Sequence, residues 1–97
     1  MTYYTRRQIV ELLEIEEVFL VSLELEDILL RDAPPEAEGE YSERMLERAR
    51  VAQNLVRDLE VNLPGVAVIV RLREEMVGLR RHMEDLLTQL GRKPRTR

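Results

Sequence analysis

The longest regular pattern of apolar positions lies in the C-terminal third of the chain. Alternating steps of three and four residues separate Ile69, Leu72, Met76, Leu79, Met83, Leu86 and Leu90. This spacing places side chains along one stripe of an α-helix, as at the a and d positions of a coiled coil. We predict one helix over 63–91 whose stripe, hereafter the seam, pairs with a second copy of the chain. The alternative is that this helix packs on its own domain.

The beginning of this helix can be interpreted in two ways. The stretch VNLPGVAVIVRL (61–72) is rich in β-branched residues, which favour a strand, and contains a Pro-Gly pair typical of turns. Asn62, however, is a good N-cap, and Pro64 falls where a helix has no N–H partner to lose. Because a strand over 66–72 would remove the first seam residues, we interpret the stretch as the start of the helix. Gly91 is expected to end it.

Two shorter helices are predicted near the N-terminus. Thr5 and Gln8 have the spacing of a capping box, which predicts a helix over about 5–13. Residues 16–26 combine a strand-like alternation with helical spacing, and we favour a helix. Its apolar residues lie on two faces, one with Leu20 and Leu23 and the other with Val18, Val21 and Leu25. Either face is a candidate for the core and the other for a partner surface.

A loop and a further helix follow. Two consecutive prolines exclude a helix over 33–41, where Gly39 permits a turn or a tight β-ribbon. Ser42 is expected to cap a helix that ends near Glu60. The predicted fold is therefore all-α, or mainly α with a minimal β wing.

Charge is distributed unevenly along the chain. The net charge of the 97 residues is −4, but residues 11–40 contain eleven acidic residues and a single base, Arg31. Such a segment repels phosphates and attracts basic surfaces. A solvated helix face is the simpler explanation of the same pattern.

Composition limits the chemistry that the chain can perform. It has no Cys and a single His, His82, so a Cys-based metal site and catalysis through several histidines are excluded. We find no phosphate-binding glycine loop and no calcium-loop pattern. No enzyme activity, cofactor or metal is expected. The absence of cysteine, of a signal-peptide pattern and of a long apolar run leads us to expect a cytoplasmic protein.

The order of elements resembles the MerR-type winged helix-turn-helix. The segments that carry the resemblance are YTRRQIVELLEI, GEYSERMLERARVAQNLVRDL and VNLPGVAVIVRL. The resemblance implies a helix-turn-helix domain over 1–62 with a wing-like loop over 33–41, then a dimerisation helix over 63–91. A basic disordered tail over 92–97 would follow. The resemblance implies that these long helices pair in antiparallel orientation, whereas the residues themselves leave parallel and antiparallel pairing open.

One feature departs from the DNA-binding members of that family. MerR regulators carry arginines on the second helix and in the wing, whereas here Val18 and Val21 are flanked by glutamates and the loop DAPPEAEGE has no base. DNA affinity depends largely on contacts between basic residues and phosphates. Poor DNA binding is therefore expected of this surface.

Within the MerR-like proteins, the chain is most similar to the CbpM-type chaperone modulators. The acidic second helix, the PGVAV helix opening and the leucine-rich last helix carry this resemblance. It implies a dimeric adaptor that binds the J-domain of a DnaJ-like, CbpA-type co-chaperone and regulates its stimulation of an Hsp70. The expected partner-binding residues are Glu16, Glu17, Val18, Val21, Glu24, Leu25 and Glu26.

The alternative is an HspR-like transcriptional regulator. The stretch VNL-x-GV, seen here at residues 61–63 and 65–66, is similar to that group. Its DNA contacts would come from the basic tail and from arginines of the first and third helices, namely Arg6, Arg7, Arg44 and Arg48.

Overall fold

The computed structural model describes residues 1–91 and contains four helices and a two-stranded sheet. Helix α1 (Arg6–Leu13) is followed by α2 (Glu17–Leu25), and α3 (Glu43–Leu59) precedes the long α4 (Leu63–Gln89). The predicted mainly helical fold with a minimal sheet and a long last helix is confirmed. The tail predicted over 92–97 lies outside the described residues.

Side-chain caps begin three of these helices where the sequence predicts them. The Thr5 side chain accepts a hydrogen bond from the Gln8 backbone N–H, and the Gln8 side-chain oxygen accepts one from the Thr5 backbone N–H, which completes the capping box. The Ser42 and Asn62 side chains accept from the third residue of α3 and α4, respectively. The stretch 61–72 is therefore the start of a helix, because Asn62 satisfies an end N–H that a helix leaves unpaired.

The sheet joins the N-terminus to the end of the loop. Strand β1 (Tyr3–Tyr4) pairs antiparallel with β2 (Tyr41–Ser42), with Tyr4 opposite Tyr41. The β-ribbon that the loop 33–41 permits therefore forms with the N-terminus. Gly39 makes this possible, since a Cβ there would collide with the backbone of Tyr4.

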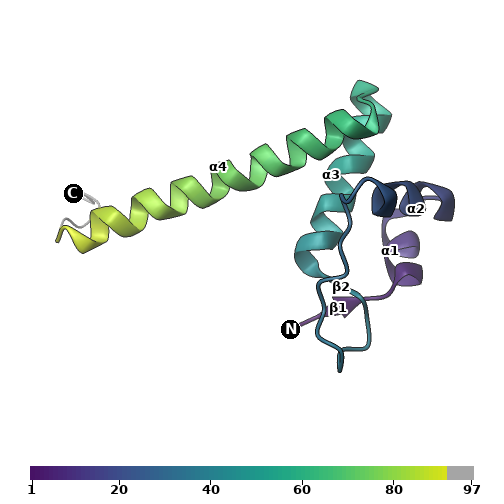
Figure 1. Ribbon diagram of the computed structural model, residues 1–97, viewed down its shortest axis with the longest axis horizontal. Helices are drawn as coiled ribbons and strands as arrows, with labels where there is room; N and C mark the ends of the chain where they lie inside the picture. Colours follow the sequence, from purple (N-terminus) through teal and green to yellow (C-terminus); the bar gives the residue numbers. More distant parts are fainter. Residues whose placement is uncertain (92–97) are drawn as a thin grey trace.

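One hydrophobic core holds α1, α2, α3 and the start of α4 together. Every element except β1 contributes fully or nearly fully buried residues: Ile9, Leu13, Leu20, Leu23, Ile28, Leu29, Tyr41, Met45, Leu46, Ala49, Ala52, Val66 and Val70. Only the first turns of α4 join this core. Figure 1 shows the rest of α4 extending away from the other helices as a free arm.

Candidate functional site

The second helix buries one of its two apolar faces and exposes the other. Leu20 and Leu23 are fully buried, whereas Val18 and Leu25 are 74% and 79% exposed and Val21 is 37% exposed. Successive residues of an α-helix are turned by about 100°, so Val18, Val21 and Leu25 form one row opposite the buried pair. We call these three residues the α2 row. The structure thereby decides which apolar face lies inside.

Acidic residues border the α2 row at both ends of the helix. Glu16 is the N-cap residue and Glu17 lies in the first turn, while Glu26 is the C-cap residue, and all three are exposed. Carboxylates at the N-terminus interact favourably with the helix dipole. These three of the four predicted glutamates are available to a partner.

The fourth glutamate has a different environment. One carboxylate oxygen of Glu24 lies 3.2 Å from a guanidinium nitrogen of Arg6, and the other accepts a hydrogen bond from the Tyr41 hydroxyl. Burial, followed by this hydrogen bond to Glu24, raises the pKa of Tyr41 to about 12. Glu24 therefore connects α2 to α1 and β2 from within the fold.

Two arginines of α3 are bound by a glutamate of α4. Arg48 places its Nε 2.9 Å and its second guanidinium nitrogen 2.7 Å from the Glu74 carboxylate, and Arg44 lies 3.2 Å from the same group. Mainly through the Arg48 hydrogen bonds, the pKa of Glu74 falls to about 2. Arg48 also donates to the carbonyl of Ile28. Three of the four arginines considered for DNA binding, Arg6, Arg44 and Arg48, thus have internal carboxylate partners.

The seam of α4 faces away from the domain. Its seven residues are between 37% and 71% exposed, from Ile69 to Leu90. Val66 and Val70, which are buried, and Glu74, which binds α3, lie on roughly the opposite side of the helix at about 100° per residue. The packed face and the seam are therefore separate surfaces of one helix.

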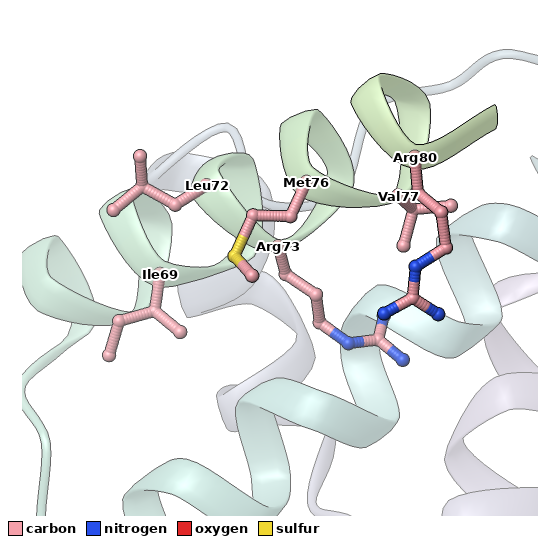
Figure 2. A pocket seen from close by; sticks show the side chains of 6 residues that line it. All are labelled: Ile69, Leu72, Arg73, Met76, Val77 and Arg80. Atoms are coloured by element: carbon pink, nitrogen blue, oxygen red, sulfur yellow. The ribbon is translucent and has the colours of Figure 1, made fainter. Parts of the chain in front are cut away.

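An open groove runs beside the first half of the seam. Its volume is about 460 Å³, and Figure 2 shows the side chains that line it along consecutive turns of α4: Ile69, Leu72, Arg73, Met76, Val77 and Arg80. Apolar residues of the seam thus share this groove with two arginines, one of which, Arg73, lies 3.5 Å from Glu47 of α3.

A second groove adjoins the N-terminus of α2 and includes residues that the sequence interpretation missed. Ile15, Phe19 and Val56 form its apolar lining, and its volume is about 590 Å³. Ile15 lies in the turn before α2 and Val56 comes from α3, so these residues meet Phe19 only through tertiary packing.

Among residues 1–91, no group of three or more His, Cys, Asp or Glu side chains is arranged to hold a metal ion. None of the helices in this part of the chain is long and apolar enough to cross a membrane.

The α1–α2 pair, the short sheet and the projecting α4 together define a helix-turn-helix domain with a long C-terminal helix. A family model described as MerR HTH family regulatory protein matches residues 4–88. The chain therefore belongs to the MerR helix-turn-helix family of regulatory proteins. No curated protein and no solved structure matches it.

Proposed function

We propose that this protein is a dimeric cytoplasmic adaptor of the CbpM type. It binds the J-domain of a DnaJ-like co-chaperone through the exposed face of α2 and regulates the stimulation of an Hsp70 by that co-chaperone. The observation that carries the proposal is the α2 row, an exposed apolar surface bordered by Glu16, Glu17 and Glu26 where a DNA reader would be basic.

Electrostatics favours a basic protein helix as the partner. The resemblance to the chaperone modulators implies a J-domain whose basic helix lies next to its His-Pro-Asp loop. Acidic residues around an apolar centre complement such a helix, and exposed charges mainly set the association rate and its salt dependence. The α2 row supplies the apolar contacts, whose burial governs dissociation.

The DNA-binding alternative is weakened by the internal partners of the arginines. Arg48 holds Glu74 through two hydrogen bonds, and Arg6 is bound to Glu24. Using these side chains for phosphate contacts would require breaking ion pairs that connect the helices. A mobility-shift titration with the protein's own promoter region distinguishes the alternatives, since tight, salt-sensitive binding would favour the regulator.

The dimer is the second part of the proposal. The seam provides seven apolar residues, and every residue of α4 from Glu75 to the end of the described chain at Gly91 is exposed. Since such a stripe matches the a and d positions of a coiled coil, a second copy of the chain is its expected occupant.

The test is a calorimetric titration of the full-length protein with its cognate J-domain. Wild type is expected to release measurable heat at micromolar concentrations, and the affinity should fall as salt rises. The variant Glu16→Lys with Glu17→Lys is expected to bind at least about tenfold more weakly. An absence of heat with wild type would contradict the proposal.

A matched control is available on α4. Glu84→Lys with Asp85→Lys makes the same change in net charge on the arm, at exposed positions outside the seam. It is expected to bind the J-domain like wild type. An equal loss in both variants would show that only net charge matters and that α2 is not the binding surface.

A further inference from the structure

The groove beside α2 has an acidic border next to an apolar floor. Ile15 and Phe19 come from the α1–α2 turn and α2, and Val56 comes from α3; all three side chains are only partly buried. Glu14 and Glu16 line the same groove and are exposed. This combination suits a partner segment in which an apolar side chain lies next to a basic one.

The single base on this groove is already partnered. Arg57 places its Nε 2.9 Å from a carboxylate oxygen of Asp58, and another guanidinium nitrogen 2.9 Å from the side-chain oxygen of Asn54. Its charge is thereby compensated within α3. The side of the groove formed by the α1–α2 turn remains acidic.

The groove continues the surface described for α2. Glu16 belongs both to the acidic border of the α2 row and to the groove. Val18 of the row and Phe19 of the groove are consecutive residues, turned from each other by about 100° around the helix. A single helix lying across the N-terminus of α2 can therefore contact both.

We propose that this groove is part of the docking surface for the same basic partner helix. An apolar side chain of that helix enters between Ile15, Phe19 and Val56, and Glu14 joins Glu16 in binding its neighbouring cations. The inference rests on the proposed function and enlarges its surface from α2 to the α1–α2 turn and α3.

The first test compares two glutamates with the same backbone conformation. Glu14 and Glu60 are both exposed C-cap residues with a φ of 55°. Glycine adopts this left-handed conformation without steric cost, so Glu14→Gly and Glu60→Gly should both keep the fold at least as stable as in wild type. Only Glu14→Gly is expected to weaken J-domain binding, by about three- to tenfold, with a smaller salt dependence.

The second test blocks the groove. Val56→Lys places a long charged side chain across the apolar floor, and Val51→Lys makes the same change at another partly buried valine of α3. Lysine can keep its ammonium group in water while its stem covers apolar surface, so thermal unfolding should confirm that both variants fold. Val56→Lys is expected to reduce affinity by about tenfold or more, and Val51→Lys is not.

The outcomes separate this inference from the proposed function. Wild-type affinity in both Glu14→Gly and Val56→Lys, together with loss of binding in α2-row variants, would overturn the groove and leave the adaptor intact. No binding by wild type would overturn both. A shift of Val56→Lys from dimer to monomer in sedimentation would assign the groove to the second copy and also overturn the inference.

Discussion

The α2 row and the seam of α4 are both exposed apolar stripes, but their charged borders differ. The charged residues of α2 and its caps are all glutamates, whereas the seam has arginines on one side, Arg73 and Arg80, and Glu75 on the other. Like charges keep two copies of α2 apart and select a basic partner, while mixed charges permit self-association. The same kind of apolar row therefore suits two different occupants.

In both surfaces, a glutamate anchors the helix that carries the apolar row to other elements of the fold. Glu24 of α2 is bound by Arg6 and Tyr41. Glu74 of α4 is bound by Arg44 and Arg48 of α3. In each case a partly buried carboxylate holds the helix that presents the apolar row. We make five predictions that test this comparison, in order of decreasing expected effect.

The largest effect is expected from charges placed in the seam. Leu79→Glu with Met83→Glu should convert the dimer to monomers in sedimentation, weakening association by more than about a hundredfold, because two carboxylates would be buried in an apolar interface. Arg81→Glu with Thr88→Glu, on the opposite side of the same helix, is the control and should leave the dimer intact. An unchanged dimer in the seam variant would refute the coiled-coil interface.

Shortening the side chains of the α2 row should weaken J-domain binding and leave the dimer intact. Val18→Ala with Leu25→Ala is expected to weaken J-domain binding by about 2–3 kcal/mol, or roughly 30- to 150-fold, with little change in stability because both side chains are exposed. Calorimetry measures the loss and sedimentation checks that the dimer remains. Val77→Ala, an exposed valine of α4 outside the seam, serves as the control. Equal binding by the two would argue against the row.

Removing the hydrogen bond between Tyr41 and Glu24 should lower the stability of the fold. Glu24→Gln or Tyr41→Phe removes one side of the charged hydrogen bond, and each is expected to lower the free energy of unfolding by about 1–3 kcal/mol. Denaturant titration measures the free energy of unfolding of each variant. The double variant should lose less stability than the sum of the two single losses, because both changes remove the same hydrogen bond. Glu17→Gln, an exposed acid of the same helix, should change stability by less than about 0.5 kcal/mol.

The tyrosine also predicts a dependence on alkaline pH. The raised pKa of Tyr41 means that its neutral form is favoured in the folded state, so its contribution is complete below pH 10 and disappears as the pH approaches 12. Wild type should lose this part of its stability in that window, and Tyr41→Phe should not. Parallel alkaline unfolding curves of the two would contradict the assignment.

The smallest effect is expected at the base of the arm. The pKa of Glu74 is lowered from 4.5 to about 2, so its contribution is complete above pH 4.5 and is lost as the pH falls toward 2. Glu74→Gln should reduce the free energy of unfolding by about 1–2 kcal/mol at neutral pH, since the pair is partly exposed, and by progressively less in acid. Glu75→Gln is the neighbouring control. A deficit that persists at pH 2 would show that charge is not the cause.

Helix positions were predictable because their signals are local. Thr5, Ser42 and Asn62 each cap the helix that the neighbouring residues predict. The sequence permitted a turn or a β-ribbon in the loop 33–41 but did not identify the pairing strand. That pairing joins Tyr4 to Tyr41, which lie far apart in the sequence. The candidate site divides in the same way: periodicity identified the α2 row and the seam, whereas the groove required Val56 to meet Phe19 across two helices.

The sequence by itself determined the four helices, the apolar row of α2 and the seven-residue seam, because periodicity and capping act over a few residues. Tertiary structure alone decided that Leu20 and Leu23 are buried, which leaves the α2 row exposed. It also decided that Glu24 and the arginines of α3 serve the fold. A pattern of apolar and charged residues defines the faces of a helix, but which face is buried depends on the elements that pack against it.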